Sequence, residues 1–258
     1  MELDDAYANG AYIAGGDKFP DRWAGAAAAF RDAAQCELDQ PYGGRAREDY
    51  DLFLPVGAPK GVVIFVHGGY WMAFDKSWWS HLAAGPLARG WAVAIPSYDL
   101  CPDITIAGIT RQIAAVVDTV AARFAGLPLR LTGHSAGGHL VARMGCADVS
   151  LAARHRIARI VPVSPLGDLE PLLRTSMNET LQLDAAEARA ESPVLHRAPD
   201  APVTVWVGAD ERPAFIAQAQ GLARAWQGDL VIEPARHHFD VIDGLADPDS
   251  NLVAALLG

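Results

Sequence analysis

One serine in this chain has the surroundings of a nucleophile. Ser135 lies in the stretch Gly133-His134-Ser135-Ala136-Gly137, between a short apolar run and an apolar helical pattern. This strand-turn-helix context is the one that a G-x-S-x-G nucleophile requires, because residues two before and two after the serine press against each other in so sharp a turn. A serine is also favoured as an ordinary helix N-cap. The paired glycines favour a hydroxyl that stands free at the edge of a sheet.

A serine hydroxyl needs a histidine to remove its proton and a carboxylate to orient that histidine. With this motif both partners follow the serine in the chain, each in a loop after a strand. The apolar run Val203–Gly208 leads to Asp210, and we predict that Asp210 is the acid, although it could instead cap the next helix. Glu211 should point elsewhere on most turns, and Asp229 precedes its strand.

Two adjacent histidines compete for the role of general base. His237 and His238 follow the last apolar run, Leu230–Glu233, in the loop before the C-terminal helical pattern. The residues alone do not decide between them.

A hydrolytic serine also needs backbone amides that stabilise the oxyanion, each contributing roughly 3 kcal/mol. One amide belongs to the residue after the nucleophile, Ala136. The others are expected in a glycine-rich loop after an early strand, and His67-Gly68-Gly69-Tyr70-Trp71 is such a loop. We therefore predict that Gly68, Gly69 and Ala136 form the oxyanion hole. His67 precedes the serine, so we interpret it as a brace of the loop.

Composition excludes several classes of protein. The chain has 258 residues, is 51% hydrophobic and carries a formal net charge of −10, which disfavours nucleic acid and acidic lipid surfaces as partners. Its three cysteines show neither a disulfide framework nor a zinc spacing, so no metal site is predicted. Neither a signal peptide nor a membrane-spanning run is visible, and we expect a cytoplasmic protein. The sequence does not reveal the oligomeric state.

Apolar strands alternate with helical patterns along most of the chain. This order predicts a single α/β domain over residues 1–258, with a mostly parallel sheet covered by helices on both faces and the site at the carboxyl ends of the strands. The alternation lapses over residues 165–201, which we interpret as a helical cap over the site; a surface excursion is the alternative. Strands are expected at residues 48–54, 61–66, 91–95, 129–132, 157–163, 202–207 and 230–233, and helices at 23–34, 78–88, 105–124, 135–146, 214–226 and 249–257.

These motifs together resemble the arylformamidase (kynurenine formamidase) branch of the α/β-hydrolases, near the H-G-G-type esterases and lipases. The loop His67–Trp71 is similar to the H-G-G-x-W signature of that branch, and Gly133–His139 to its nucleophile segment. The resemblance implies an α/β-hydrolase fold with Ser135 as nucleophile and Asp210 as acid. It also implies that His238, directly before Phe239, is the base.

The expected reaction is hydrolysis of a small acyl group on an aryl amide or ester of a small molecule, with no metal or organic cofactor. Tyr70 and Trp71 are assigned to substrate binding, whereas Trp78 and Trp79 are interpreted first as core residues. A carboxylesterase or thioesterase is the close alternative. A binding protein with a hydrolase fold and no activity is a less favoured alternative, because candidates for all three residues of a triad are present.

Overall fold

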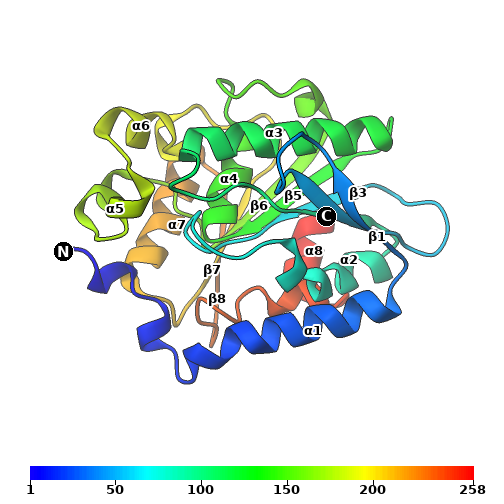
Figure 1. Ribbon diagram of the computed structural model, residues 1–258, viewed down its shortest axis with the longest axis horizontal. Coiled ribbons are helices and arrows are strands. Elements are labelled where there is room, and N and C mark those ends of the chain that lie inside the picture. The colour runs from blue at the N-terminus through cyan, green and yellow to red at the C-terminus, as the bar shows by residue number, and fades with distance from the viewer.

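The computed structural model describes residues 1–258 and contains one eight-stranded sheet between two layers of helices (Figure 1). The strand order is β1-β2-β4-β3-β5-β6-β7-β8. Strands β3 to β8 run parallel to one another, and only the β1–β2 and β2–β4 pairs are antiparallel. The strands are β1 Cys36–Pro41, β2 Asp49–Phe53, β3 Val62–Val66, β4 Ala92–Pro96, β5 Leu129–His134, β6 Ile157–Val163, β7 Thr204–Gly208 and β8 Asp229–Glu233.

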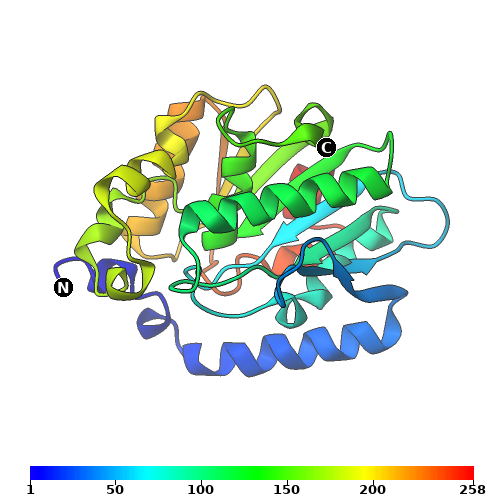
Figure 2. The same ribbon diagram turned by 45° about the horizontal axis from the view of Figure 1, so that its top comes forward.

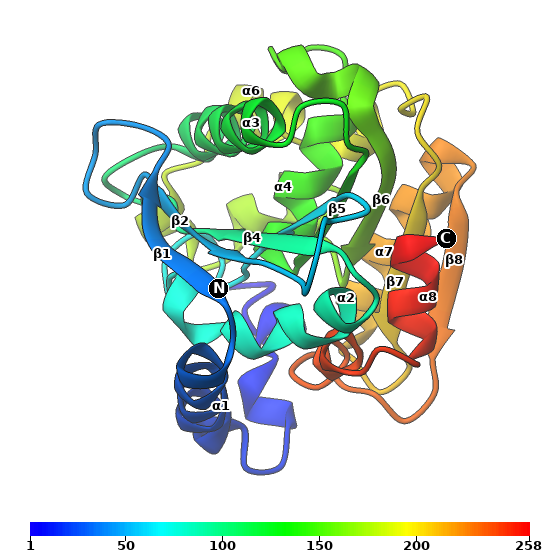
Figure 3. The same cartoon turned by 90° about the vertical axis from the view of Figure 1, so that its right-hand side faces the viewer.

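The helices form two layers because neighbouring strand residues point to opposite faces of the sheet. On β3, Val62, Ile64 and Val66 pack into the core beneath α3, α4 and α7, whereas Val63 and Phe65 pack into the core beneath α1, α2 and α8. Figure 3 shows these two groups on opposite sides of the sheet. The helices are α1 Phe19–Ala33, α2 Ala84–Ala88, α3 Ile106–Arg123, α4 Ala136–Gly145, α5 Asn178–Leu181, α6 Ala185–Ala190, α7 Pro213–Trp226 and α8 Asn251–Leu257.

The observed elements confirm the predicted α/β architecture, with two local differences. Strand β1 was not predicted, because its residues are polar and half-buried or exposed at the edge of the sheet. The helix expected over residues 78–88 is divided into short 3₁₀ turns followed by α2. None of the helices joins enough length to enough apolar character to cross a lipid bilayer.

The first residues of the chain run along the rim of the sheet instead of joining it. Single 3₁₀ turns at Asp5–Tyr7, Gly10–Tyr12 and Gly16–Lys18 lead into α1. In Figure 2 this blue segment lies between the α5 and α6 region and the start of α1. We call residues 3–18 the N-terminal strap.

Candidate active site

Ser135 occupies a strained turn between β5 and α4. Its backbone dihedrals are φ 56° and ψ −116°, a conformation that costs about 1–3 kcal/mol for a residue other than glycine. A Cβ on Gly133 would lie 2.4 Å from the Gly137 carbonyl oxygen, and a Cβ on Gly137 would lie 2.0 Å from the Val66 oxygen. The glycines are thus required by backbone contact. The Ser135 side chain makes no capping hydrogen bond, so the N-cap interpretation does not describe it.

A buried carboxylate holds His238. Glu211 Oε2 lies 2.6 Å from His238 Nδ1, and the Glu211 side chain is 0% exposed. Its other oxygen accepts hydrogen bonds from the Gly208 amide, at 2.8 Å, and from the Ser164 hydroxyl. A carboxylate so placed accepts the Nδ1 proton of His238, which leaves Nε2 as the nitrogen able to take a proton from another group.

The prediction that Asp210 orients the histidine was wrong by one residue. Asp210 is exposed, and it caps no helix, because α7 begins after Arg212 without a side-chain cap. The chain turns back directly after β7, where the Glu211 amide donates to the Gly208 oxygen at 3.4 Å. This turn returns the Glu211 carboxylate to the end of the strand, where it meets the Gly208 amide and His238.

The two neighbouring histidines have different surroundings. His238 is 4% exposed and lines the same pocket as Ser135. His237 is half-buried, pairs with Asp240 at 3.1 Å, and packs edge-on against Phe19 at 5.3 Å between ring centroids. Of the two, only His238 meets both the buried carboxylate and the pocket that contains the serine.

Free amides lie beside the serine. A Cβ on Gly68 would be 3.1 Å from Ser135 Cβ, so the backbone of the glycine loop approaches the serine closely. The amides of Gly68 and Gly69 donate to no backbone carbonyl. Ala136 is the first residue of α4, where a helix leaves its amides unpaired. The assignment of Gly68, Gly69 and Ala136 to an oxyanion hole stays a prediction, and the position of these amides beside Ser135 is compatible with it.

The glycine loop is held from behind by aromatic stacking. His67 is fully buried, stacks on Tyr98 with centroids 4.2 Å apart, and its carbonyl accepts the Tyr98 hydroxyl proton at 2.9 Å. Burial lowers the pKa of His67 to about 4, so the ring stays neutral at pH 7. These contacts match its predicted role as a brace.

Ser135 and His238 open into a cavity of about 560 Å³. Tyr70 lines it, as expected for a residue that contacts substrate, and its hydroxyl donates to the Tyr7 oxygen at 2.7 Å. The lining residues are Gly10, Ala11, Gly16, Asp17, Pro20, Trp23, Gly69, Tyr70, Met72, Ala73, Phe74, Trp79, His134, Ser135, His238 and Phe239.

Trp71 does not line this pocket, and its assignment to substrate binding was wrong. The side chain is 0% exposed and packs edge-on against His139 with centroids 5.1 Å apart. Its backbone φ is 58°, so its side chain does not follow the direction expected for an extended loop. Trp79, interpreted first as a core residue, is buried and also forms part of the pocket wall.

The pocket is walled by the beginning of the chain, not by residues 165–201. No residue of that expected cap is among the lining residues, whereas Gly10, Ala11, Gly16 and Asp17 of the N-terminal strap are. The strap is fastened near the site, since Asp5 pairs with Arg212 at 2.7 Å. The expected cap contacts the strap away from the pocket, as in the hydrogen bond of 3.2 Å from the Leu3 amide to the Arg174 oxygen.

His134 is a site residue that sequence reasoning passed over. It lines the pocket next to Ser135, and its Nε2 lies 2.8 Å from the carbonyl oxygen of His238. Because only a protonated nitrogen can donate to a carbonyl, Nε2 carries the proton. Burial holds the pKa of His134 well below its usual range. A neutral His134 thus ties the turn that carries Ser135 to the loop that carries His238. Its position directly before Ser135 in the G-x-S-x-G motif is the feature of the sequence that could have identified it as a site residue.

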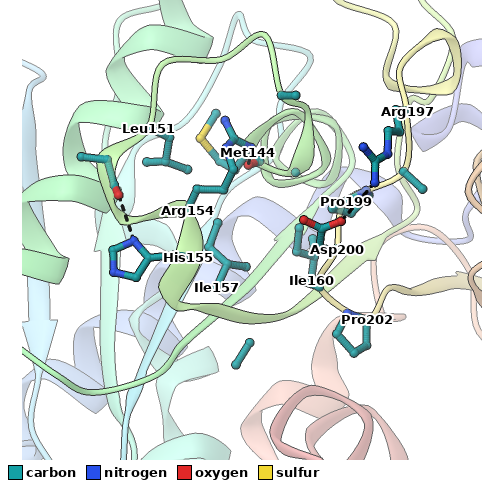
Figure 4. A pocket seen from close by; sticks show the side chains of 16 residues that line it. Met144, Leu151, Arg154, His155, Ile157, Ile160, Arg197, Pro199, Asp200 and Pro202 are labelled. Atoms are coloured by element: carbon teal, nitrogen blue, oxygen red, sulfur yellow. Dashed lines mark hydrogen bonds and ion pairs between the residues drawn. The ribbon is translucent and has the colours of Figure 1, made fainter.

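A larger cavity, of about 660 Å³, lies at the opposite edge of the sheet, near the amino ends of β6 and β7 (Figure 4). Its charged side chains are engaged: Arg154 donates to the Met144 and Val149 oxygens, and Arg197 pairs with Asp200. It contains no nucleophile paired with a base, so size alone does not mark the site.

One group of side chains has the donor atoms of a metal site. The ligand atoms of Cys146, Asp148 and His196 lie within 4.8 Å of one another. However, the guanidinium of Arg143 already binds both oxygens of Asp148, at 3.1 and 2.7 Å. A cation would have to displace or adjoin that positive charge, so this donor set fits a metal poorly.

Comparisons with known proteins agree with the fold and with a hydrolase. The kynurenine formamidase of Salmo salar is 29% identical over 88% of this chain and 83% of its own length. A crystal structure described as a "putative thioesterase" from Silicibacter sp. TM1040 is 57% identical, covers all of both chains and superposes with a TM-score of 0.97. Esterase B from Lactobacillus rhamnosis, 20% identical over 88% of this chain and 87% of its own, shares the fold with a TM-score of 0.68.

A protein-family model described as BD-FAE matches residues 50–223, more than half of the chain and the part that holds the glycine loop, the nucleophile turn and Glu211. The chain therefore belongs to the BD-FAE family and is an arylformamidase-like α/β-hydrolase that acts on esters or amides.

Proposed function

We propose that this hydrolase removes a small acyl group from an aryl amine or an aryl alcohol, with Ser135, His238 and Glu211 as its catalytic triad. The observation that supports this most directly is the buried pair of His238 and Glu211 in the pocket that also contains Ser135. The relatives named kynurenine formamidase support an aryl amide as substrate.

The reaction begins with an attack of Ser135 Oγ on the acyl carbonyl carbon, while His238 Nε2 takes the hydroxyl proton. The resulting imidazolium is stabilised by the Glu211 carboxylate on Nδ1. The negative charge on the carbonyl oxygen is stabilised by the amides of Gly68, Gly69 and Ala136, each worth about 3 kcal/mol in a dry site.

The tetrahedral intermediate collapses when His238 gives its proton to the leaving nitrogen or oxygen. The aryl amine or alcohol departs and the acyl group stays on Ser135 as an ester. Water, deprotonated by the same histidine, then hydrolyses this ester and restores the serine hydroxyl.

An acyl thioester is the second candidate, because the protein that is 57% identical over its full length is described as a putative thioesterase. Esters, amides and thioesters pass through the same kind of intermediate, and they differ in the proton that the leaving group needs. The triad alone does not rank them.

The test compares initial rates on N-formylkynurenine, short-chain p-nitrophenyl esters and acyl thioesters, with Ser135→Ala as control. Turnover of the aryl formamide well above the other classes, lost in Ser135→Ala, supports the proposal. Turnover of the p-nitrophenyl esters alone keeps the triad and limits the substrate to esters of aryl alcohols, whereas turnover of thioesters alone keeps the triad and changes the substrate class. If turnover persists in Ser135→Ala, the proposed nucleophile is wrong.

A further inference from the structure

The ring of His238 has close aromatic neighbours in addition to its hydrogen bond to Glu211. The ring of Phe215, on α7, has its centroid 4.3 Å from that of His238, and the ring of His134 lies at 4.6 Å. Both neighbours are buried, with Phe215 0% exposed and His134 4% exposed. The imidazole is therefore held by packing against its ring as well as by the carboxylate at Nδ1.

The hydrogen bond at Nδ1 fixes one edge of the imidazole but not the plane of the ring. The χ2 angle of a histidine has a broad distribution, so the ring can tilt about this hydrogen bond. A tilt displaces Nε2, and a misplacement of about 1 Å in a catalytic group can cost about 100-fold in rate. A ring packed at 4.3 Å restricts the tilt, because packing locks the rotamer of the side chain that it touches.

Phe215 comes from the segment that also supplies the carboxylate. Glu211 lies in the turn after β7, and Phe215 is the third residue of α7, which begins at Pro213. The Phe215 amide donates to the Arg212 oxygen at 2.9 Å, which fixes the start of the helix. One short segment thus supplies both the carboxylate at Nδ1 of His238 and a ring against its imidazole.

The N-terminal strap packs against this segment. Tyr7 is 5% exposed and meets Phe215 edge-on, with centroids 5.8 Å apart. Its hydroxyl accepts a hydrogen bond from Gln218 of α7 at 3.1 Å. Just before the helix, Arg212 pairs with Asp5 of the strap at 2.7 Å. Apolar, polar and ionic contacts therefore join the strap to the beginning of α7.

Neither Tyr7 nor Phe215 lines the cavity that contains Ser135. A ligand in that cavity makes no direct contact with either side chain. An effect of these two rings on the reaction must therefore pass through a residue that does line the cavity, and His238 is the one that Phe215 touches. Such an effect should appear in kcat and not in KM.

From these contacts we infer that Phe215 is a positioning residue for the general base, and that Tyr7 holds Phe215 in place. The inference rests on the proposed function, since it takes His238 as the base and Ser135 as the nucleophile. It gives the strap a second role besides lining the cavity. Through Phe215, the beginning of the chain keeps the imidazole of His238 in the orientation that the reaction needs.

The first experiment compares Phe215→Leu with Phe53→Leu on p-nitrophenyl acetate. Both phenylalanines are 0% exposed, and Phe53 of β2 packs against Phe30, so the control loses a buried ring outside the site. We expect Phe215→Leu to lower kcat at least about tenfold and to change KM less than about threefold, and Phe53→Leu to lower kcat less than about twofold. Equal losses of kcat in the two variants, or a loss confined to KM, would overturn the inference.

Circular dichroism checks that both variants fold. If Phe215→Leu is unfolded, Phe215→Met takes its place, because an unbranched methionine fills the space of the ring without its flat face. The expected changes in kcat and KM are the same, and so are the results that would overturn the inference.

The second experiment does not depend on the substrate class. Diethyl p-nitrophenyl phosphate phosphorylates an activated serine: Ser135 Oγ bonds to phosphorus, p-nitrophenolate leaves, and the hydroxyl proton passes to His238. We expect the rate constant of this reaction to fall at least about tenfold in Phe215→Leu and less than about twofold in Phe53→Leu. Equal rate constants in the two variants overturn the positioning role.

This reaction separates a failure of the inference from a failure of the proposed function. If the unmodified chain is phosphorylated but turns over no aryl amide or ester, the proposed substrate is wrong, and the two rate constants still decide the role of Phe215. If Ser135 is not phosphorylated at all, both the triad and the positioning role are overturned.

A double variant tests the link to the strap. Tyr7→Leu removes the ring but keeps the carbonyl that Tyr70 binds, whereas Tyr7→Phe removes only the hydroxyl that Gln218 binds. We expect Tyr7→Leu to lower kcat at least about threefold and Tyr7→Phe less than about 1.5-fold. Combined with Phe215→Leu, Tyr7→Leu should add less than about 1.5-fold, because the effects of residues in contact are not additive. Losses that multiply would show that Tyr7 does not act through Phe215.

Discussion

Glu211 Oε2 lies 2.6 Å from His238 Nδ1, and this carboxylate is enclosed by the end of β7 and by Ser164. Asp210, its neighbour in the chain, points into solvent. The contact with His238 therefore distinguishes Glu211 from Asp210, although the sequence alone offers both as acids.

Glu211→Gln should lower kcat by about 10³–10⁴-fold, because an amide can neither stabilise the imidazolium nor fix the productive tautomer of His238. Asp210→Asn should change kcat less than about twofold, since an exposed carboxylate contributes little. Initial rates on an aryl ester check both variants. Comparable losses in the two would contradict the assignment of Glu211.

Substitution of the two histidines should separate their roles. His238→Ala should reduce kcat by at least about 10³-fold through loss of the general base. His237→Ala removes the contacts with Asp240 and Phe19 and should leave most activity. Circular dichroism of both variants confirms that they fold. An inactive but folded His237→Ala would require the base to be assigned again.

A methyl group at Gly137 should disrupt the nucleophile turn. The added Cβ would lie 2.0 and 2.5 Å from the carbonyl oxygens of Val66 and His67, which belong to backbone and cannot rotate away. We expect Gly137→Ala to lower the free energy of unfolding by about 3 kcal/mol and to abolish activity. Gly25→Ala on α1 meets nothing within 4 Å and should stabilise the protein by up to about 1 kcal/mol. Urea unfolding gives the free energy of unfolding of both variants. A Gly137→Ala variant as stable as the unmodified chain would contradict the predicted clash.

Buried histidines should make the protein sensitive to acid. Burial lowers the pKa of His139 to about 4 from an ordinary 6.5, so the unfolded chain takes up a proton first as the pH falls. The free energy of unfolding then decreases as pH drops from 6.5 to 4, by up to about 1.4 kcal/mol per pH unit for this group.

His139→Gln keeps a donor for the Glu191 oxygen that His139 Nε2 meets at 2.7 Å, and it removes the titration. Its free energy of unfolding should fall less steeply between pH 6.5 and 4 than that of the unmodified chain. Urea unfolding at several pH values gives both slopes, and identical slopes would show that His139 does not contribute.

The residues that the sequence located well are those fixed by local backbone geometry. Gly133 and Gly137 are required by contacts within a single turn, so their spacing identified Ser135. The strands were predicted from apolar runs because most of them are buried on both faces. Strand β1, at the edge and largely polar, lacked that signal.

The predictions that were wrong depended on the direction of a side chain or on contacts between residues far apart in the sequence. Whether Asp210 or Glu211 faces the histidine depends on one tight turn after β7, which composition does not reveal. Trp71 has a positive φ, which is rare for a bulky residue, and its residue type gives no sign of that conformation. The N-terminal strap is held at the site by contacts between residues about 60 to 210 positions apart, such as Tyr7 with Tyr70 and Asp5 with Arg212, and no local periodicity encodes such contacts.

Because the strap lines the cavity, changes near residue 1 and changes near residue 258 should affect the cavity differently. Gly10, Ala11, Gly16 and Asp17 line the cavity that contains Ser135, so a proteolytic cut or an insertion within the strap would reshape the cavity as well as the surface. Gly258 lies against Arg130 and Arg159, near the amino ends of β5 and β6, whereas Ser135 follows the carboxyl end of β5. An affinity tag, a surface tether or a fluorescent reporter therefore belongs after Gly258, where it leaves the catalytic cavity undisturbed.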